Sequence, residues 1–316
     1  MLLSWLRNLP GRLLLALRSG RQHYRLLFSG YRSHWYTSSG LCIHSYRRSQ
    51  PVGPDQNPAL PVIFLHGLLD SGRSFRYLAR HMEDRPLVLL DLPGYGRSFL
   101  PAVRELWHLP VMARMLYRYL ETITPPYVLV THSMGGLIAL QMMEFAEQLG
   151  RPHGVARLHM VAPGLLPLRQ AEREYRRKLF YPESPAVVQD LLGHLYHARL
   201  PEIPPSVLRA LCVEWNQPGF HFLAENTIEM ETKVFFTVKR IRRASGQVPV
   251  HFYWGKEDRM VRWQDGRSLA RSLGASFDLL DDCGHAIHLE SADRLARAIL
   301  AREGRARKPK RAIRSA

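Results

Sequence analysis

With 316 residues and 46% hydrophobic content, the chain is long enough for one large globular domain with an insertion. Its net charge of +17 lies at the two ends: residues 1–50 carry +8, residues 302–316 carry +6, and the 251 residues between them carry +3. This distribution excludes a strongly basic, nucleic-acid-binding body, and three scattered cysteines (Cys42, Cys212 and Cys283) exclude a disulfide framework.

Residues 1–33 form a basic, apolar N-terminal extension. At about 100° per residue, its large apolar side chains gather on one side, and Arg18 and Arg25 are displaced from them. The apolar residues are Leu13, Leu17, Tyr24, Leu27 and Phe28. The pattern predicts a helix that lies in a membrane surface, broken into two pieces by Pro10-Gly11. The alternative is a helix that packs on the body and contributes only solubility.

Neither end of the chain predicts a membrane span. No apolar run approaches the roughly 20 residues that cross a bilayer, and arginines interrupt any signal-peptide core. The tail, residues 302–316, is basic and is predicted to be a disordered extension. We therefore expect a cytoplasmic protein that is peripheral on the membrane, with residues 1–30 and 302–316 meeting an anionic membrane surface rather than nucleic acid.

Alternating strand and helix patterns occupy residues 34–163 and 247–301. They open with a hairpin that turns at Ser39-Gly40. Strands are then predicted at 61–66, 86–91, 127–132, 157–162, 248–254 and 276–281, and helices at 73–82, 108–123, 135–149, 263–273 and 291–301. Because crossovers between parallel strands are right-handed, the pattern predicts an α/β fold with a mostly parallel, doubly wound sheet.

The alternation stops between residues 164 and 246. This segment has proline clusters at 182–185 and 201–205, helical stretches and no convincing buried strand, so we predict a helical insertion. It is rich in aromatic residues, most of which should form its own core while a few line an apolar pocket. They include Phe180, Tyr181, Tyr196, Trp215, Phe220, Phe222, Phe235 and Phe236.

Ser133 follows an apolar run of β type and precedes Met134 and two glycines. A sharp strand-to-helix turn of this kind exposes a serine hydroxyl to a base, which the weakly nucleophilic alcohol needs. The usual spacing is Gly-x-Ser-x-Gly; Gly135 supplies the second glycine, but Thr131 replaces the first. Thr131 must therefore fit with local strain or point into a space with room for it. The alternative is a buried strand that ends in an ordinary serine N-cap.

Two more predicted strands end in residues that could activate this serine. Asp258 is the fourth residue of Gly-x-x-Asp after the 248–254 strand, which favours it over Glu257. His285 follows Gly284 after the 276–281 strand. Taken singly, each motif is more often a plain turn or a solvated loop histidine. Together they give the chain order serine, acid, histidine at the carboxyl ends of parallel strands, where such sheets place their sites.

At this point the chain resembles the α/β-hydrolase superfamily over roughly residues 40–301. The resemblance is carried by His66-Gly67, Asp91–Ser98, Thr131–Gly136, Gly255–Asp258 and Cys283–His285. It implies an oxyanion hole formed by the backbone N–H groups of Leu68 and Met134, and it makes the insertion at 164–246 a helical cap. The Asp91–Ser98 loop is expected to be structural, with Asp91 accepting hydrogen bonds from backbone N–H groups.

Within the superfamily, the chain looks most like membrane-associated lipases and esterases of the monoacylglycerol lipase kind. This implies a serine hydrolase that cleaves a carboxylic ester with an acyl chain, through Ser133, His285 and Asp258 and without a metal or another cofactor. A carbon–carbon or amide hydrolase or an acyltransferase would use the same residues. From another class, the chain could be a non-catalytic scaffold bound to a membrane.

Overall fold

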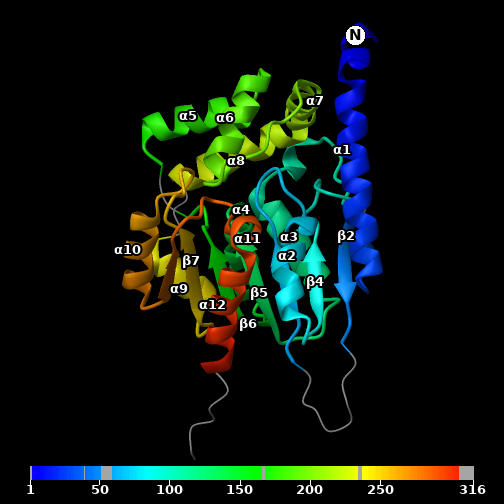
Figure 1. Ribbon diagram of the computed structural model, residues 1–316. Coiled ribbons are helices and arrows are strands. Elements are labelled where there is room, and N and C mark those ends of the chain that lie inside the picture. Colours follow the sequence, from blue (N-terminus) through cyan, green and yellow to red (C-terminus); the bar gives the residue numbers. More distant parts are fainter. Residues whose placement is uncertain (1, 39, 51–58, 166–167, 234–236, 306–316) are drawn as a thin grey trace, which may run out of the picture.

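A single mixed sheet organises the molecule (Figure 1). The computed structural model describes residues 2–38, 40–50, 59–165, 168–233 and 237–305. Over these residues the sheet has eight strands in the order β1-β2-β4-β3-β5-β6-β7-β8, and only the β1/β2 and β2/β4 pairs are antiparallel. The strands are β1 (Arg32–Ser38), β2 (Leu41–Arg48), β3 (Val62–Leu65), β4 (Leu87–Leu90), β5 (Tyr127–His132), β6 (Val155–Val161), β7 (Val250–Gly255) and β8 (Ser276–Leu280).

The predicted doubly wound sheet is confirmed, and the six predicted parallel strands lie within two residues of their expected ends. The hairpin is also found, although Ser39 lies outside the described residues. Successive side chains of β3 enter different cores: Ile63 and Leu65 pack on one face of the sheet, Val62 and Phe64 on the other. Burial on both faces explains why this strand is a continuous apolar run.

Helices cover both faces of the sheet (Figure 1). On one face, α3 (Leu109–Leu120), α4 (Met134–Gln148), α9 (Val238–Ser245) and α10 (Trp263–Leu273) contribute to the larger core. On the other face lie α2 (Arg76–Ala79) and α12 (Ala292–Arg305). The helix predicted at 73–82 is in fact three short pieces, because the 3₁₀ turns η1 (Gly72–Phe75) and η2 (Arg80–Met82) flank α2. A further 3₁₀ turn, η3 (Arg104–Leu106), precedes α3.

The N-terminal helix corrects one prediction. Pro10-Gly11 was expected to break it, yet α1 (Leu2–Phe28) is continuous through Pro10. The reason is packing: α1 lies along α7 (Pro205–Trp215), and at Gly11 its backbone approaches Ser206 so closely that no Cβ would fit. Leu26 anchors the other end of α1 in the core. No helix in the described part of the chain is long and apolar enough to cross a bilayer.

Four helices form a layer above the sheet, which we call the cap (Figure 1). They are α5 (Gln170–Phe180), α6 (Pro185–Leu195), α7 and α8 (Pro218–Lys233). Leu179, Leu191 and Trp215 of these helices are buried in the larger core rather than in a separate core of the cap, and Phe235 and Phe236 lie outside the described residues. The cap also reaches the loop after β8, where the Ala286 N–H donates to the Leu195 carbonyl at 3.0 Å.

Two predicted boundaries are wrong. The insertion was expected to run to 246, but α9 belongs to the core: Ile241 is fully buried, and Arg240 pairs with Glu144 of α4. The tail was expected to start at 302, but α12 continues to Arg305 because Glu303 is held by Arg157 and His159 at 3.0 Å each. Residues 306–316 of that tail lie outside the described residues.

Candidate active site

Ser133 occupies the sharp turn between β5 and α4. Its φ of 50° and ψ of −120° lie in a region that non-glycine residues rarely adopt. The turn is held on both sides, because the Ser133 N–H donates to the Val161 carbonyl and the Gly136 N–H donates to the Ser133 carbonyl, each at 3.0 Å. A strained backbone that its surroundings enforce presents the half-buried serine above the carboxyl end of the sheet.

Thr131 fits beneath this turn without a positive φ. Its side chain is fully buried, and its Oγ1 lies 3.4 Å from the His159 carbonyl oxygen. Gly136 lies beside it, and an added Cβ there would be 3.4 Å from that Oγ1. Gly135 is the glycine that the turn requires, since a Cβ there would lie 2.5 Å from the carbonyl oxygen of Leu65.

Asp258 and His285 meet as a buried pair. The Nδ1–H of His285 donates to Asp258 Oδ2 at 2.9 Å, and their side chains are 4% and 0% exposed. The other carboxylate oxygen accepts the N–H groups of Met260 and Val261, at 2.8 and 2.9 Å. Glu257 is the acid that the sequence analysis ranked below Asp258. Its backbone N–H donates to the Cys283 carbonyl. The carboxylate is thus fixed from both sides, and the unprotonated nitrogen left on His285 is Nε2.

His132 links this pair to Ser133. Its Nε2–H donates to the backbone carbonyl of His285 at 3.0 Å, and the two rings lie 4.7 Å apart. No hydrogen bond joins the Ser133 hydroxyl to His285 among the described residues. Such contacts are often long in free hydrolases and close only around substrate.

The loop after β3 borders Ser133 from the opposite side. A Cβ on Gly67 would lie 3.0 Å from the Ser133 Cβ, so only glycine permits this approach without displacement. His66 fixes the loop: its Nδ1–H donates to the Gly67 carbonyl at 2.8 Å, and its Nε2 accepts the Leu92 N–H at 2.9 Å. Burial lowers the pKa of His66, which keeps this neutral arrangement.

The two backbone groups expected to hold an oxyanion flank this contact. Met134 is the first residue of α4, so the helix itself offers its N–H no acceptor. Leu68 follows Gly67 in the turn, and the next residue, Leu69, has a φ of 59°.

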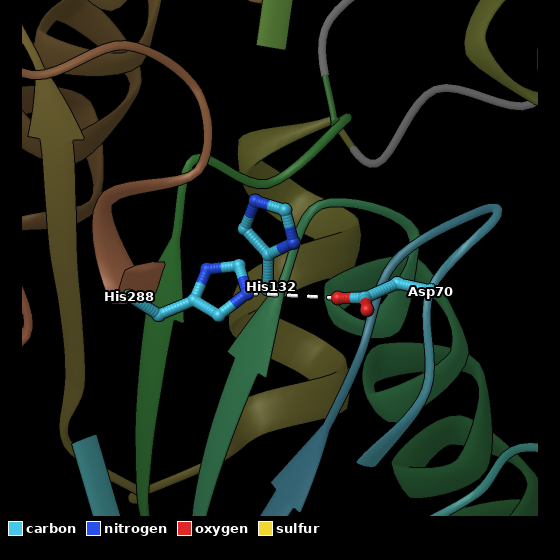
Figure 2. Close-up of side chains that lie close together, drawn as sticks. All are labelled: Asp70, His132 and His288. Carbon is cyan, nitrogen blue, oxygen red and sulfur yellow. Dashed lines mark ion pairs between the residues drawn. The ribbon is translucent and has the colours of Figure 1, made fainter. Parts of the chain in front are cut away.

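Three side chains that the sequence analysis did not single out lie close together (Figure 2), and one of them, His132, is in ring contact with His285. Asp70 follows the β3 turn, His132 ends β5, and His288 lies in the short helix α11 (Ile287–Glu290). The sequence carried weak signals for two of them, since His132 precedes Ser133 and His288 lies one helical turn after His285.

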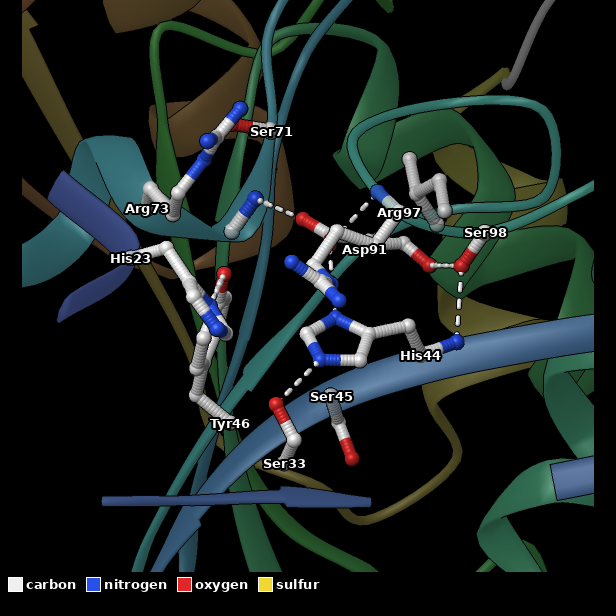
Figure 3. Close-up of polar contacts among 12 residues, drawn as sticks. His23, Ser33, His44, Ser45, Tyr46, Ser71, Arg73, Asp91, Arg97 and Ser98 are labelled. Atoms are coloured by element: carbon white, nitrogen blue, oxygen red, sulfur yellow. Dashed lines mark hydrogen bonds and ion pairs between the residues drawn. The ribbon is translucent and has the colours of Figure 1, made fainter. Parts of the chain in front are cut away.

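The Asp91 loop is structural, as predicted (Figure 3). The buried Asp91 carboxylate accepts the N–H groups of Gly72 at 2.9 Å and Arg97 at 3.0 Å, and the Nδ1–H of His44 at 2.8 Å. His44 in turn contacts Ser33, whose Oγ lies 3.0 Å from its Nε2. This chain of hydrogen bonds joins the hairpin to the loops after β3 and β4.

A groove of about 730 Å³ runs along α1. Its walls come from α1, α7 and the segment from Leu69 to Arg76. Tyr196 and Leu289 also line it, so the groove reaches α11 beside the His285 loop. Both polar and apolar residues line the groove, and Arg18 and Arg73 are among them.

Comparisons with known proteins agree with this architecture. The pattern of the alpha/beta hydrolase family matches residues 62–298. The chain is 26% identical to "Lipase LipV" of Mycobacterium tuberculosis over 82% of this chain and 97% of the relative. It is 29% identical to the "Magnesium-chelatase 30 kDa subunit" of Rhodobacter capsulatus over 79% and 88%.

Among solved structures, the chain resembles a bacterial membrane phospholipase A with a TM-score of 0.73 and 20% identity. The likeness covers 96% of this chain and 94% of that one. At this identity the likeness concerns the fold.

Proposed function

Because the chain belongs to the alpha/beta hydrolase family, we propose that it is a serine hydrolase that cleaves a carboxylic ester of an acyl-chain substrate. The observation that carries the proposal is the strained Ser133 turn, whose neighbour His132 is hydrogen bonded to the loop of the buried His285–Asp258 pair. Lipase and phospholipase names among the similar proteins support the choice of an ester and an acyl chain.

In the proposed mechanism, Ser133 Oγ attacks the ester carbonyl while His285 Nε2 takes its proton. Asp258 accepts the Nδ1–H of His285, so it fixes the reactive tautomer and stabilises the imidazolium. The backbone N–H groups of Leu68 and Met134 bind the oxygen that becomes negative. The alcohol leaves with the proton from His285, and a water molecule, activated by the same nitrogen, releases the acid and regenerates Ser133.

The exposed face of α1 supports a substrate at a membrane surface. Leu13, Leu17, Tyr24 and Phe28 form a stripe along the helix, and they are 57%, 60%, 60% and 89% exposed although their side chains are large and apolar. The opposite side of α1 packs on α7 and on the wall of the groove. We propose that the stripe enters an anionic membrane surface and that the groove receives the lipid ester beside it.

A labelling experiment tests the hydrolase. A fluorophosphonate probe should modify the purified protein at Ser133, and p-nitrophenyl esters of increasing chain length should be hydrolysed with a preference for acyl chains longer than acetyl. Absence of labelling at Ser133 would contradict the proposal and favour a non-catalytic scaffold. A preference for acetate would retain the serine hydrolase but exclude the acyl-chain substrate.

Vesicle flotation tests the membrane surface. The protein should float with phosphatidylglycerol-containing vesicles more than with phosphatidylcholine vesicles, and Leu17→Glu with Phe28→Glu should reduce this binding at least about tenfold. Phe99→Glu is a matched control, because Phe99 is 60% exposed and lies outside α1. Equal losses in the two variants would show that the stripe has no special role.

A further inference from the structure

Asp70, His132 and His288 converge from three separate segments next to Ser133 (Figure 2). One potential ligand atom from each lies within 4.8 Å of the other two. His288 Nε2 and Asp70 Oδ2 lie 3.5 Å apart. Tetrahedral zinc with bonds of about 2.0–2.2 Å needs ligand atoms about 3.3 Å apart, so one pair already has nearly this spacing.

The two histidines offer lone pairs that nothing described uses. His132 donates its Nε2–H to the His285 carbonyl, which leaves Nδ1 as an unprotonated acceptor. That Nδ1 and the Nδ1 of His288 have no hydrogen-bond partner among the described residues, and His288 Nε2 faces only Asp70 Oδ2, although the two histidine side chains are only 5% and 1% exposed. Buried nitrogens without partners are uncommon and point to a bound species.

His132 also has the surroundings of a metal ligand. Its second nitrogen is oriented by a backbone carbonyl, as is usual for histidines that bind zinc. Gly67 keeps the space beside it open, since a Cβ there would lie 3.1 Å from Nδ1.

A route to solvent exists through Asp70. Its side chain is 27% exposed, and it lines the groove between α1 and α7. We propose that Asp70, His132 and His288 form a binding site for a divalent transition-metal ion of borderline softness, with Zn²⁺ as the best fit. Two imidazoles and one carboxylate are a typical zinc donor set and leave a fourth position open.

The site would regulate the proposed hydrolase by inhibition, a consequence that rests on the proposed function. His132 is covalently joined to Ser133 and hydrogen bonded to the His285 loop. An ion that draws the three ligands together must shift these loops, and a displacement of about 1 Å in catalytic groups can cost about 10²-fold in rate. Zn²⁺ should therefore inhibit reversibly, and a chelator should restore activity.

The test measures binding separately from activity. Tag-free full-length protein, stripped with EDTA, is titrated with Zn²⁺ against a fluorescent chelator. We expect one high-affinity ion per chain, and a loss of at least about tenfold in affinity for Asp70→Asn and for His288→Gln. Asp190→Asn is the matched control, because Asp190 and His194 form another Asp–His pair, at 3.4 Å, on the surface of α6.

Circular dichroism first establishes that each variant is folded, and His288→Gln and Asp70→Asn provide two independent readings. Equal affinity in the wild type and both variants would overturn the site, as would a wild type that binds no Zn²⁺ or an equal loss in Asp190→Asn. Each variant's inhibition by Zn²⁺ is then compared with its own metal-free rate. If the proposed function is wrong, there will be no Ser133-dependent ester hydrolysis for Zn²⁺ to inhibit, while Zn²⁺ binding will remain. This outcome separates failure of the proposed function from failure of the metal site.

Discussion

Two sets of serine, histidine and aspartate in this molecule have histidine–aspartate contacts that are alike. One set is Ser133, His285 and Asp258, and the other is Ser33, His44 and Asp91. The Nδ1–Oδ2 distance is 2.9 Å in the first and 2.8 Å in the second, and both carboxylates are fully buried. Only the second set has a hydrogen bond between serine and histidine, at 3.0 Å (Figure 3). Side-chain distances alone would therefore favour the second set over the one that we propose to be catalytic.

The backbone that carries each serine makes the difference. Ser33 lies in β1, a regular edge strand, opposite Tyr46 of β2. Ser133 lies in an enforced turn with a φ of 50°, at the first turn of α4 and against Gly67. A nucleophile needs N–H donors near the atom that becomes negative, and a helix N-terminus supplies them while a paired strand does not.

The two carboxylates also have different partners. Asp91 accepts N–H groups from Gly72 and Arg97 in two different loops, so it joins distant parts of the chain. Asp258 accepts N–H groups from Met260 and Val261 in its own loop. We infer that Asp91 serves stability and Asp258 serves the orientation of His285.

The largest expected effect separates the two serines. Ser133→Ala should lower ester hydrolysis by about 10⁴-fold or more, because no other group can form the acyl-enzyme. Ser33→Ala should leave the rate within about twofold, since it removes one partly exposed hydrogen bond. Rates with a p-nitrophenyl ester measure both. A large loss in Ser33→Ala with normal thermal stability would reverse the assignment of the two sets.

The next comparison separates the two aspartates. Asp258→Asn should lower kcat by about 10⁴-fold, because an amide cannot hold His285 in its reactive tautomer. Asp91→Asn should instead lower the free energy of unfolding by about 3–5 kcal/mol, since it disrupts a buried, charged hydrogen-bond network. Urea denaturation and kinetics on both variants measure these effects. The interpretation fails if Asp91→Asn is as stable as the wild type, or if Asp258→Asn retains its kcat.

The comparison also explains what could be predicted from the sequence. Strand ends and glycine-bearing turns are local patterns, so Ser133, Asp258 and His285 could be predicted as candidates, although only their combination in chain order favoured a site over three ordinary turns. The continuity of α1 through Pro10 and the docking of α9 on α4 could not, because packing against distant segments decides them. Contacts across the sheet, such as His44 with Asp91 and His288 with Asp70, leave no spacing pattern in the chain.

The smallest expected effect concerns the residue that departs from the usual turn. Thr131→Gly would restore Gly-x-Ser-x-Gly, yet we expect ester hydrolysis to change by less than about threefold. Thr131 is already fully buried without a positive φ, and the Ser133 backbone is hydrogen bonded to Val161 and Gly136 rather than to residue 131.

Stability should respond instead, with a loss of about 1–3 kcal/mol in urea denaturation, because Thr131→Gly empties a buried site and loosens β5. A tenfold gain in kcat without a loss of stability would mean that Thr131 strains the turn and misplaces Ser133. The turn that distinguishes Ser133 from Ser33 would then have a less favourable backbone geometry in the natural sequence than with glycine at position 131.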